Sequence, residues 1–489
     1  MPILPFGEFR PDVSDFKGQY SRTILNVLPQ GDGYGPFKSL VQITAALPAV
    51  CRGIFFARKN DGSIAIFAGT STKLYVLDNT TFDWTDASKG ASTYTALALT
   101  AQWQFVQFNN FVIAVQQNAN PQVFDLTSST TFDDLGGSPP QAAYVSVVNR
   151  FVVLSGLASP NVYRIQWSDL NGITTWTSGT GQSDFQDLAD GGIVRGVAGG
   201  EFGVIFQDSS IRRMTYSPGS PYIFGIDRIS SDDGLSGAYS LIQAGDRVFF
   251  YSPQGFKMLL PGGYPQAIGK ERVDRTFLAA YDSDQPQLFI GAHDPNAQRV
   301  FWGFKSKSGA ATQFDTLLCY DWVLDRWTQS GISGQYIGSL AKPSLTLENI
   351  DTIYGSNIDT ITLNSLDDIS NLSLAQLACM DTTNKFGFFN GAAMQATLVT
   401  PEQGDDTRRI LVRGFRPITD STDALGSIVY RETPQATSVT SDESSLNRLG
   451  ICEQRVSARY ARGKVRIPAG STWTYAAGIE PDVVTIGVQ

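Results

Sequence analysis

One short pattern recurs along the first three-quarters of this chain and limits the folds that are open to it. A strand carrying an aromatic residue ends in a polar turn, and a second large aromatic residue returns about eight or nine residues later. The four clearest copies are residues 74–77 with Trp84, 123–126 with Phe132, 162–165 with Trp176 and 318–320 with Trp327. Adjacent strands of an antiparallel sheet would bring the two aromatic residues of each copy together. The pattern therefore predicts a series of short antiparallel sheets.

Looser hairpins at residues 202–216, 248–260 and 352–363 continue the series. The turns lie roughly 40 to 50 residues apart, a period that is typical of the four-stranded blades of a β-propeller. A single blade cannot bury both of its faces, so the blades must close into a ring. We therefore predict an all-β fold with a β-propeller of six or seven blades over residues 49–365. A stacked sandwich or a β-solenoid with irregular hairpins is the alternative that the pattern leaves open.

The segments before and after the repeats have a different character. Residues 1–48 contain two short apolar strands separated by Pro and Gly, and we predict an N-terminal arm that packs against a larger part of the protein. Five or six longer strands follow residue 378, so residues 366–489 are predicted to form a β-sandwich-like platform domain. A helix is predicted over residues 366–379, where Leu and Ile recur every three or four residues.

Charge and cysteine content limit the function. The net charge is -9 and no sustained basic run occurs, which argues against a protein that grips nucleic acid by neutralising its phosphates. The same charge is compatible with a surface past which nucleic acid slides. The four cysteines are far apart and form no CxxC pair, so the sequence supports neither a zinc knuckle nor a redox motif. We predict that the protein needs no metal and no cofactor.

The N-terminal residues lack the basic start and the apolar stretch of a signal peptide. No window approaches the roughly 20 apolar residues of a membrane span. We therefore expect a soluble chain without a membrane span, made in the cytoplasm or in the cytoplasm of a host.

Residues suited to catalysis are scarce. The single histidine, His293, lies in a turn-rich stretch and is predicted to occupy a solvent-facing loop. Paired acidic residues could bind calcium or serve as the acid and base of a glycosidase, but pairs among Ser and Gly are also what turns require. These pairs are Asp133–Asp134, Asp232–Asp233, Asp367–Asp368 and Asp405–Asp406. We interpret them as turns, and predict no catalytic residue and no enzymatic activity.

One local concentration of positive charge lies in the C-terminal part of the chain. Its members are Arg455, Arg459, Arg462, Lys464 and Arg466. Alternation along a strand places every second residue on one face, so these side chains could form a docking face for an acidic neighbour. An ordinary solvated strand face explains the pattern equally well.

Several stretches, taken in order, resemble one protein family. They are Arg10-Pro11-Asp12, residues 26–29 and 32–40, residues 67–75 with Trp84, Trp167-Ser168-Asp169 with Trp176, and residues 250–256. Together they resemble the tail nozzle proteins of short-tailed bacteriophages, also called tail tubular or packaged-DNA stabilisation proteins. The resemblance runs from residue 8 to about residue 480 and rests on the order and spacing of the stretches.

The resemblance implies a structural virion protein of the phage tail, assembled in the host cytoplasm. Members of this family form a homohexameric tube below the portal and the adaptor (head-to-tail connector) protein, retain packaged DNA and conduct it during ejection. The expected partners are the adaptor, tail fibre or tailspike proteins, and double-stranded DNA that passes without specific binding. Two alternatives stay open at this point: a propeller that binds or hydrolyses carbohydrate with Asp and Trp at its central mouth, and a peptide-binding propeller scaffold.

Overall fold

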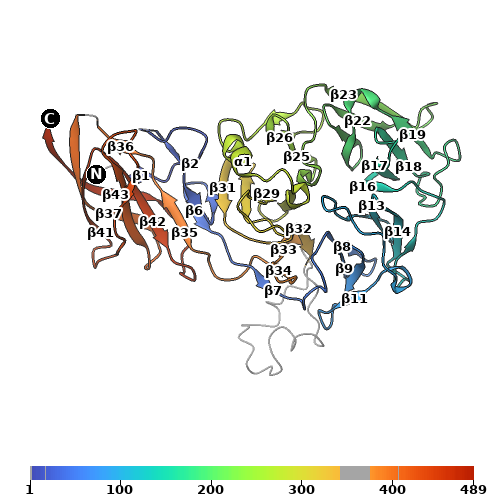
Figure 1. Ribbon diagram of the computed structural model, residues 1–489, viewed down its shortest axis with the longest axis horizontal. Coiled ribbons are helices and arrows are strands. Elements are labelled where there is room, and N and C mark those ends of the chain that lie inside the picture. Colours follow the sequence, from blue (N-terminus) through green and yellow to red (C-terminus); the bar gives the residue numbers. More distant parts are fainter. Residues whose placement is uncertain (1–2, 17, 342–374, 406, 489) are drawn as a thin grey trace.

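The structure, a computed structural model, describes residues 3–16, 18–341, 375–405 and 407–488. In this part of the chain, seven sets of four antiparallel strands are arranged as blades around one axis (Figure 1). The protein therefore contains a β-propeller with seven blades, which is the upper value of the predicted range. Beside the propeller, the two ends of the chain together build a β-sandwich (Figure 1).

Five blades use consecutive strands that end before residue 268. They comprise β8 (Ile54–Arg58), β9 (Ile64–Gly69), β10 (Leu74–Leu77) and β11 (Trp84–Asp86); β12 (Gln104–Phe108), β13 (Phe111–Gln116), β14 (Ala119–Asp125) and β15 (Asp133–Asp134); β16 (Ala142–Val148), β17 (Phe151–Leu157), β18 (Arg164–Trp167) and β19 (Asp184–Asp187); β20 (Val194–Ala198), β21 (Gly203–Gln207), β22 (Ile211–Tyr216) and β23 (Phe224–Ser230); and β24 (Ile242–Ala244), β25 (Arg247–Ser252), β26 (Gly255–Leu259) and β27 (Gln266–Ala267). The first strand of each blade lies nearest the axis.

The sixth blade follows the one α-helix of the described residues, α1 (Asp274–Ala280), and the seventh closes the ring. The sixth comprises β28 (Ile290–Asp294), β29 (Arg299–Phe304), β30 (Thr316–Asp321) and β31 (Arg326–Ser330), and the seventh comprises β32 (Tyr336–Ala341), β33 (Ala375–Met380), β34 (Phe386–Phe388) and β7 (Val41–Gln42). Four short 3-10 helices lie between strands: η1 (Lys89–Ala91), η2 (Ala189–Gly191), η3 (Ala238–Ser240) and η4 (Pro286–Leu288). The helices of the described part include none that is long and apolar enough to span a membrane.

Strand β7 closes the ring from the N-terminal side of the chain. Val41 pairs with Phe388 and Gln42 pairs with Gly387, so the outer strand of the last blade comes from before the first blade. The propeller therefore extends beyond both predicted boundaries. Strand β7 lies before residue 48, and strands β33 and β34 lie after residue 365. A search for repeats counts contiguous strands and cannot see one that is contributed from the other end of the chain.

The predicted helix at residues 366–379 is also wrong for its described part. Residues 375–379 belong to β33, which pairs along its length with β32 and buries Cys379 and Met380. Pairing within the last blade overrides the helical spacing of Leu and Ile. The rest of that prediction, and the hairpin predicted at residues 352–363, lie outside the described residues.

The β-sandwich is made of two sheets, and each contains strands from both ends of the chain. One sheet has the order β41-β37-β43-β6-β5, with β1 also paired to β43. Its strands are β41 (Cys452–Ala458), β37 (Arg408–Thr419), β43 (Ala476–Val488), β6 (Gly33–Pro36), β5 (Val27–Gln30) and β1 (Leu4–Pro5). The other sheet consists of β4 (Ile24–Leu25), β35 (Ala396–Val399), β42 (Tyr460–Ile467), β38 (Leu425–Arg431), β39 (Val439–Thr440), β36 (Gln403–Gly404) and β40 (Ser444–Ser445).

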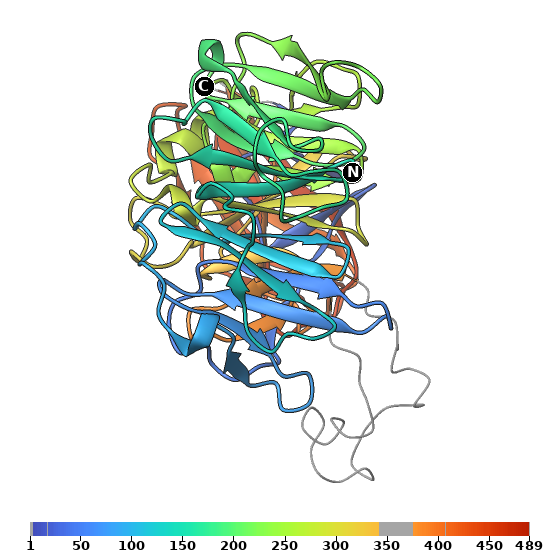
Figure 2. The same cartoon turned by 90° about the vertical axis from the view of Figure 1, so that its right-hand side faces the viewer.

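The N-terminal arm joins the sandwich to the propeller. Strand β4 pairs with β35 of the sandwich and, in parallel, with β31 of the sixth blade through Leu25 and Gln329, so one sheet runs through both parts. Apolar side chains of both parts form one continuous core, in which Trp302 and Trp327 of the sixth blade belong to the same cluster as Val412 and Val465 of the sandwich. Figure 2 shows the sandwich strands, in orange and red, behind the blades in the side view.

Acidic residues on either side of one bend fix the arm to both parts. This segment connects β2 (Glu8–Phe9) with β3 (Tyr20–Ser21), two short strands that pair in parallel. Asp12 accepts hydrogen bonds of 2.8 Å from the main-chain N–H groups of Arg275 and Thr276 in the first turn of α1. Three residues later, Asp15 forms an ion pair with Arg462 of β42. A carboxylate at a helix N-terminus satisfies N–H groups that otherwise have no partner, so the arm completes the propeller as well as the sandwich.

The aromatic residues of the repeat differ in burial. Trp327 is fully buried, lies opposite Tyr320 across β30 and β31, and donates through Nε1 to the carbonyl of Ile268 at 3.0 Å. Its ring centroid lies 5.6 Å from that of Trp302. Trp84 is only half-buried and lies opposite Leu77, while Phe132 packs edge-on against Phe67. The repeat therefore marks where blades pack, but not how deeply each aromatic side chain is enclosed.

Candidate functional site

The described residues contain no group of three or more His, Cys, Asp or Glu side chains that could hold a metal ion. All four cysteines are buried, free thiols. Burial raises the pKa of Cys51 and Cys319 to about 12, so both thiols are protonated at neutral pH and are poor nucleophiles.

His293 is not in a solvent-facing loop, and that prediction is wrong. It lies in β28 and is half-buried, with Nδ1 3.1 Å from the hydroxyl oxygen of Ser339 on β32. The same hydroxyl group donates to the main-chain carbonyl of His293. Burial lowers the pKa of His293, so the ring is neutral at physiological pH and links two neighbouring blades. Asp294 and Pro295 are typical of a turn, but Asp294 is the last residue of β28 and the turn begins only after it.

The paired acidic residues are held by basic side chains or lie in turns. Lys89 forms ion pairs with Asp133 and Asp134, and Asp233 is buried against the Lys257 ammonium group. Asp405 lies in a turn, where Oδ1 accepts hydrogen bonds from Thr407. Asp406 and the pair Asp367–Asp368 lie outside the described residues. The described pairs are therefore occupied by contacts within the chain.

The five members of the basic cluster do not share one surface role. Arg462 is 13% exposed and is paired with Asp15 and Glu402, which are 5% and 1% exposed. Arg466 forms an ion pair with Glu443, and Arg459 has its own contacts within the chain. Among the described residues, Arg455 and Lys464 form no ion pair; Arg455 is exposed and Lys464 is half-buried. The sequence could not separate the two groups, because Asp15 lies 447 positions from Arg462.

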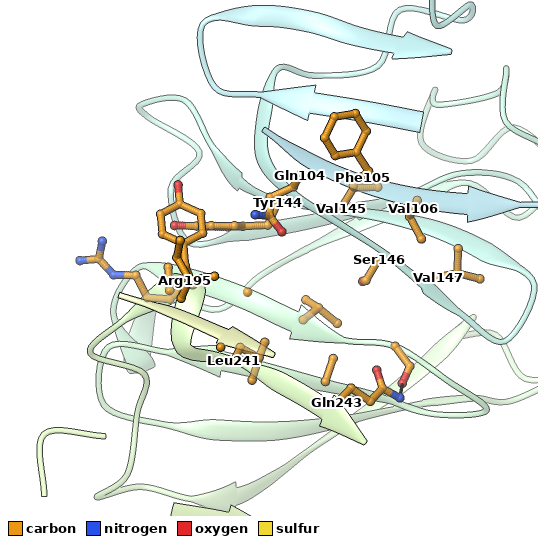
Figure 3. A pocket seen from close by; sticks show the side chains of 18 of the residues that line it. Gln104, Phe105, Val106, Tyr144, Val145, Ser146, Val147, Arg195, Leu241 and Gln243 are labelled. Carbon is orange, nitrogen blue, oxygen red and sulfur yellow. Dashed lines mark hydrogen bonds between the residues drawn. The ribbon is translucent and has the colours of Figure 1, made fainter. Parts of the chain in front are cut away.

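The propeller axis contains a cavity of about 420 Å³ (Figure 3). The first strands of several blades line it, and its residues include Phe105, Tyr144, Ser146, Arg195 and Gln243. Figure 3 shows Tyr144 and Arg195 at one end of the cavity and Val147 and Gln243 at the other. No Asp, Glu or Trp is among the described residues that line it. This part of the axis therefore offers neither a carboxylate pair nor an indole face to a sugar.

Tyrosines and glutamines close the axis at the Arg195 end of this cavity. The hydroxyl oxygen of Tyr239, in η3, accepts a hydrogen bond of 2.9 Å from the main-chain N–H of Gln102, which precedes β12 on a distant blade. Gln102 also donates through Nε2 to the main-chain carbonyl of Gln287, so it links a third blade. The ring of Tyr144 lies 6.2 Å from that of Tyr239. Burial raises the pKa of Tyr144 to about 12, so its hydroxyl group stays neutral at physiological pH.

One half-buried carboxyl group, that of Asp274, gives the stability of the protein a predictable dependence on pH. Burial raises the pKa of Asp274 to about 6, and its Oδ1 accepts a hydrogen bond of 3.1 Å from the N–H of Phe256. Because the pKa in the folded state lies above the ordinary value, the protonated group contributes stability below about pH 4, and this contribution is lost as the pH rises through about 6.

We therefore expect Asp274→Asn to remove part of the loss of stability between about pH 4 and pH 7, by roughly 1 to 2 kcal/mol, since partial contact with water reduces the full effect. The variant keeps an oxygen that accepts from Phe256. Urea denaturation of both proteins at several pH values measures the difference. Parallel curves for the two proteins would contradict the assignment.

The fold defines the class of protein: a seven-bladed β-propeller joined by its N-terminal arm to a β-sandwich. No protein-family model matches the chain, and no curated protein matches it in sequence. Among solved structures, it is similar to a functionally unknown protein from Desulfotomaculum acetoxidans DSM 771, with 11% identity over 60% of this chain and 91% of that one, and a TM-score of 0.36.

Two further solved structures are similar. BamB from Moraxella catarrhalis shares 13% identity over 62% of this chain and 92% of that chain, with a TM-score of 0.31. The computationally designed Ika8 protein shares 10% identity over 72% of this chain and 98% of its own, with a TM-score of 0.37. At these values we base no functional inference on the three structures.

Proposed function

We propose that this chain is the structural subunit of the tail nozzle of a short-tailed bacteriophage. In this proposal six copies form a tube below the portal and adaptor, retain packaged DNA and conduct it during ejection. The resemblance of residues 8 to about 480 to nozzle proteins supports the family. One of the resembling stretches, Arg10-Pro11-Asp12, contains the carboxylate that ties the arm to α1.

The observation that carries the proposal is an unpaired strand edge on the sandwich. Strand β43 pairs with β37 along its whole length, but on its other side β1 and β6 pair only with residues 476–479. Within residues 481–488, the side of β43 that faces away from β37 pairs with no other strand among the described residues, and Val484 and Ile486 are exposed along this stretch. A long, apolar edge of this kind is a template for pairing with another chain, and a ring of identical subunits would cover it.

Side chains bridge the axis of the propeller, and this supports a DNA channel that lies between subunits and does not pass through a propeller. Tyr239 and Gln102 bridge the axis, and the cavity beside them holds only about 420 Å³. A tube formed by several copies would leave the propellers as rigid bodies around a common channel. The net charge of -9 suits such a channel, since like charges keep DNA from adhering to its wall.

Arg455 and Lys464 remain candidates for the contact with the adaptor, because they form no ion pair among the described residues. Arg462 is unsuitable as a probe of docking, since a change there would first release Asp15 and the arm. We propose that the protein resides in the virion tail and is assembled in the host cytoplasm.

The decisive experiment measures the mass of the purified protein by native mass spectrometry, alone and with the portal and adaptor proteins of its phage. We expect a hexamer, formed at least on the portal–adaptor complex. Val484→Arg and Ile486→Arg together should prevent assembly, because charge on an edge strand opposes pairing. Tyr222→Arg, at a residue that is 77% exposed on the propeller, is the matched control and should assemble normally. A wild-type protein that stays monomeric with both partners would overturn the proposal.

A further inference from the structure

Two adjoining clefts lie where loops of the fourth and fifth blades meet. One has a volume of about 160 Å³ and the other of about 330 Å³. The first is lined by residues 199–202, between β20 and β21, and by residues 245–246 and 260–262 beside β25 and β26. The two clefts share the lining residues Glu201, Phe202, Arg213 and Gly262. Arg213 therefore lies where the clefts adjoin.

Strand pairing decides on which face of its blade the Arg213 side chain lies. In β22, Arg213 is opposite Val204 of β21, and paired residues of neighbouring strands share one face of a sheet. Val204 packs with Val248 and Leu259 of the fifth blade in one buried apolar cluster. These three residues also line the first cleft. The Arg213 side chain is therefore on the face of the fourth blade that meets the fifth.

The guanidinium group of Arg213 has no polar partner among the described residues. Its Cζ atom lies 5.7 Å from the centroid of the Phe202 ring, a distance at which the ring attracts a cation. Asp227 is opposite Arg213 on β23, yet the two form no ion pair. The Nε atom is enclosed, whereas the terminal nitrogens Nη1 and Nη2 are accessible. The half-buried side chain thus offers two donor nitrogens of one planar group to an occupant of the clefts.

The charges of the lining select the chemistry of this occupant. A carboxylate and a phosphate both match the planar fork of an arginine. However, Glu201 and Asp246 also line the first cleft, are exposed and form no ion pair among the described residues. These two carboxylates repel a doubly charged phosphate and attract a cation. An occupant with one carboxylate and a neighbouring cationic group complements all three charged side chains.

The shape of the clefts favours a peptide. Phe202, Ile229 and Leu260 are half-buried and contribute apolar surface to the first cleft. A Cβ atom on Gly245 or Gly262 would meet no atom within 4 Å, so the space in front of the main chain is open there. Because the clefts adjoin at Arg213, an extended segment can place side chains in both of them and approach the exposed main chain.

We propose that these clefts bind an extended segment of a partner protein, in which an acidic side chain pairs with Arg213 and an adjacent basic side chain faces Glu201 and Asp246. The acidic side chains in the lining disfavour nucleic acid, which offers phosphates alone. The site is independent of the nozzle function proposed above, because none of its lining residues lies on β43.

Peptide selection on the full-length protein tests this proposal. An mRNA-displayed library of random peptides, about seven residues long, is depleted on the Arg213→Gln variant and then selected on the wild type. We expect the enriched peptides to share an Asp or Glu with a Lys or Arg beside it. In fluorescence anisotropy, the strongest peptide should bind Arg213→Gln at least about tenfold more weakly than the wild type, because a charge-assisted contact with two hydrogen bonds is lost.

A double-mutant cycle and a matched control identify the contact. Replacing the acidic residue of the peptide with its amide should weaken binding to the wild type but cause little further loss with Arg213→Gln. The double variant Glu201→Gln, Asp246→Asn should weaken binding of the unchanged peptide by a smaller factor, since exposed charges contribute less. Arg448→Gln removes the same charge from an exposed site on the sandwich and should bind as the wild type does.

Three results would overturn the proposal. The first is that no peptide is enriched, or that the enriched peptides bind Arg213→Gln as tightly as the wild type. The second is that inorganic phosphate, used as a second probe, binds at Arg213 while acidic peptides do not. The third is an equal loss with Arg448→Gln, which would indicate a general attraction between charges. If Arg213→Gln is unstable, Arg213→Lys takes its place, and loss of the planar fork should still weaken binding at least about threefold.

Discussion

Replacing Trp327 with alanine is expected to lower the free energy of unfolding by about 3 to 5 kcal/mol, because a large, fully buried ring leaves a cavity that its neighbours cannot fill. Trp327 has no exposed surface and packs between Trp302 and Phe256 in the core that the propeller shares with the sandwich. The substitution also leaves the carbonyl of Ile268 without its indole donor. Urea denaturation and the yield of soluble protein measure the effect.

Trp84→Ala is the matched control for this experiment. Trp84 belongs to the same sequence repeat, but it is half-buried and its indole nitrogen has no hydrogen-bond partner among the described residues. We therefore expect a clearly smaller loss of stability, since less surface is buried and no hydrogen bond is broken. Equal losses at the two positions would mean that the cavity at Trp327 collapses, and that the shared core tolerates rearrangement.

Replacing Arg462 with methionine is expected to cost about 3 to 5 kcal/mol, because it leaves the buried carboxylate of Asp15 without its counter-charge. The Nε atom of Arg462 lies 2.5 Å from Oδ2 of Asp15, and both side chains are largely buried. Glu402 keeps Arg431 as a second partner, so the loss concentrates on Asp15. The arm should separate from β42, and hydrogen exchange and limited proteolysis of residues 3–25 should both increase.

Arg466→Met tests whether burial is the cause. Arg466 lies on the same strand as Arg462 and pairs with Glu443. This pair is more exposed, with 27% of the Arg466 side chain and 31% of the Glu443 side chain accessible. An exposed pair contributes less than about 1 kcal/mol, so the arm should stay protected in this variant. If Arg466→Met released the arm as readily as Arg462→Met, the anchoring role of the Asp15–Arg462 pair would be wrong.

The sequence predicts those parts of the fold that depend on neighbouring residues. Each hairpin, such as β30 with β31, combines alternation, a turn and a cross-strand aromatic pair within about 20 residues, so pattern and structure agree there. The same local signals indicate the β-sandwich and the separate character of the arm. The β43 edge leaves no signal, since a paired and an unpaired edge have the same alternation.

Contacts between distant residues could not be predicted in the same way. The closure of the ring by Val41, the pair of Asp15 with Arg462 and the meeting of Gln102 with Gln287 join positions that no local pattern relates. The sequence predicts a loop at His293 because its partner Ser339 belongs to the next blade and leaves no local signal.

Strands from the N-terminal part of the chain complete both the propeller and the sandwich, and this limits when folding can finish during synthesis. Residues 4–42 are made long before the strands that they join, since β7 pairs with residues 387 and 388, and β1 and β6 pair with residues 476–479. Until residue 388 has been made, the growing propeller therefore has an open end, and until residue 479 has been made, β1 and β6 lack their partner β43. Such late, distant pairing slows folding and prolongs the exposure of apolar strands, so a nascent chain of this design depends on chaperones or on rapid completion. A ribosome that stalls after the fifth blade would release a product that is unable to close.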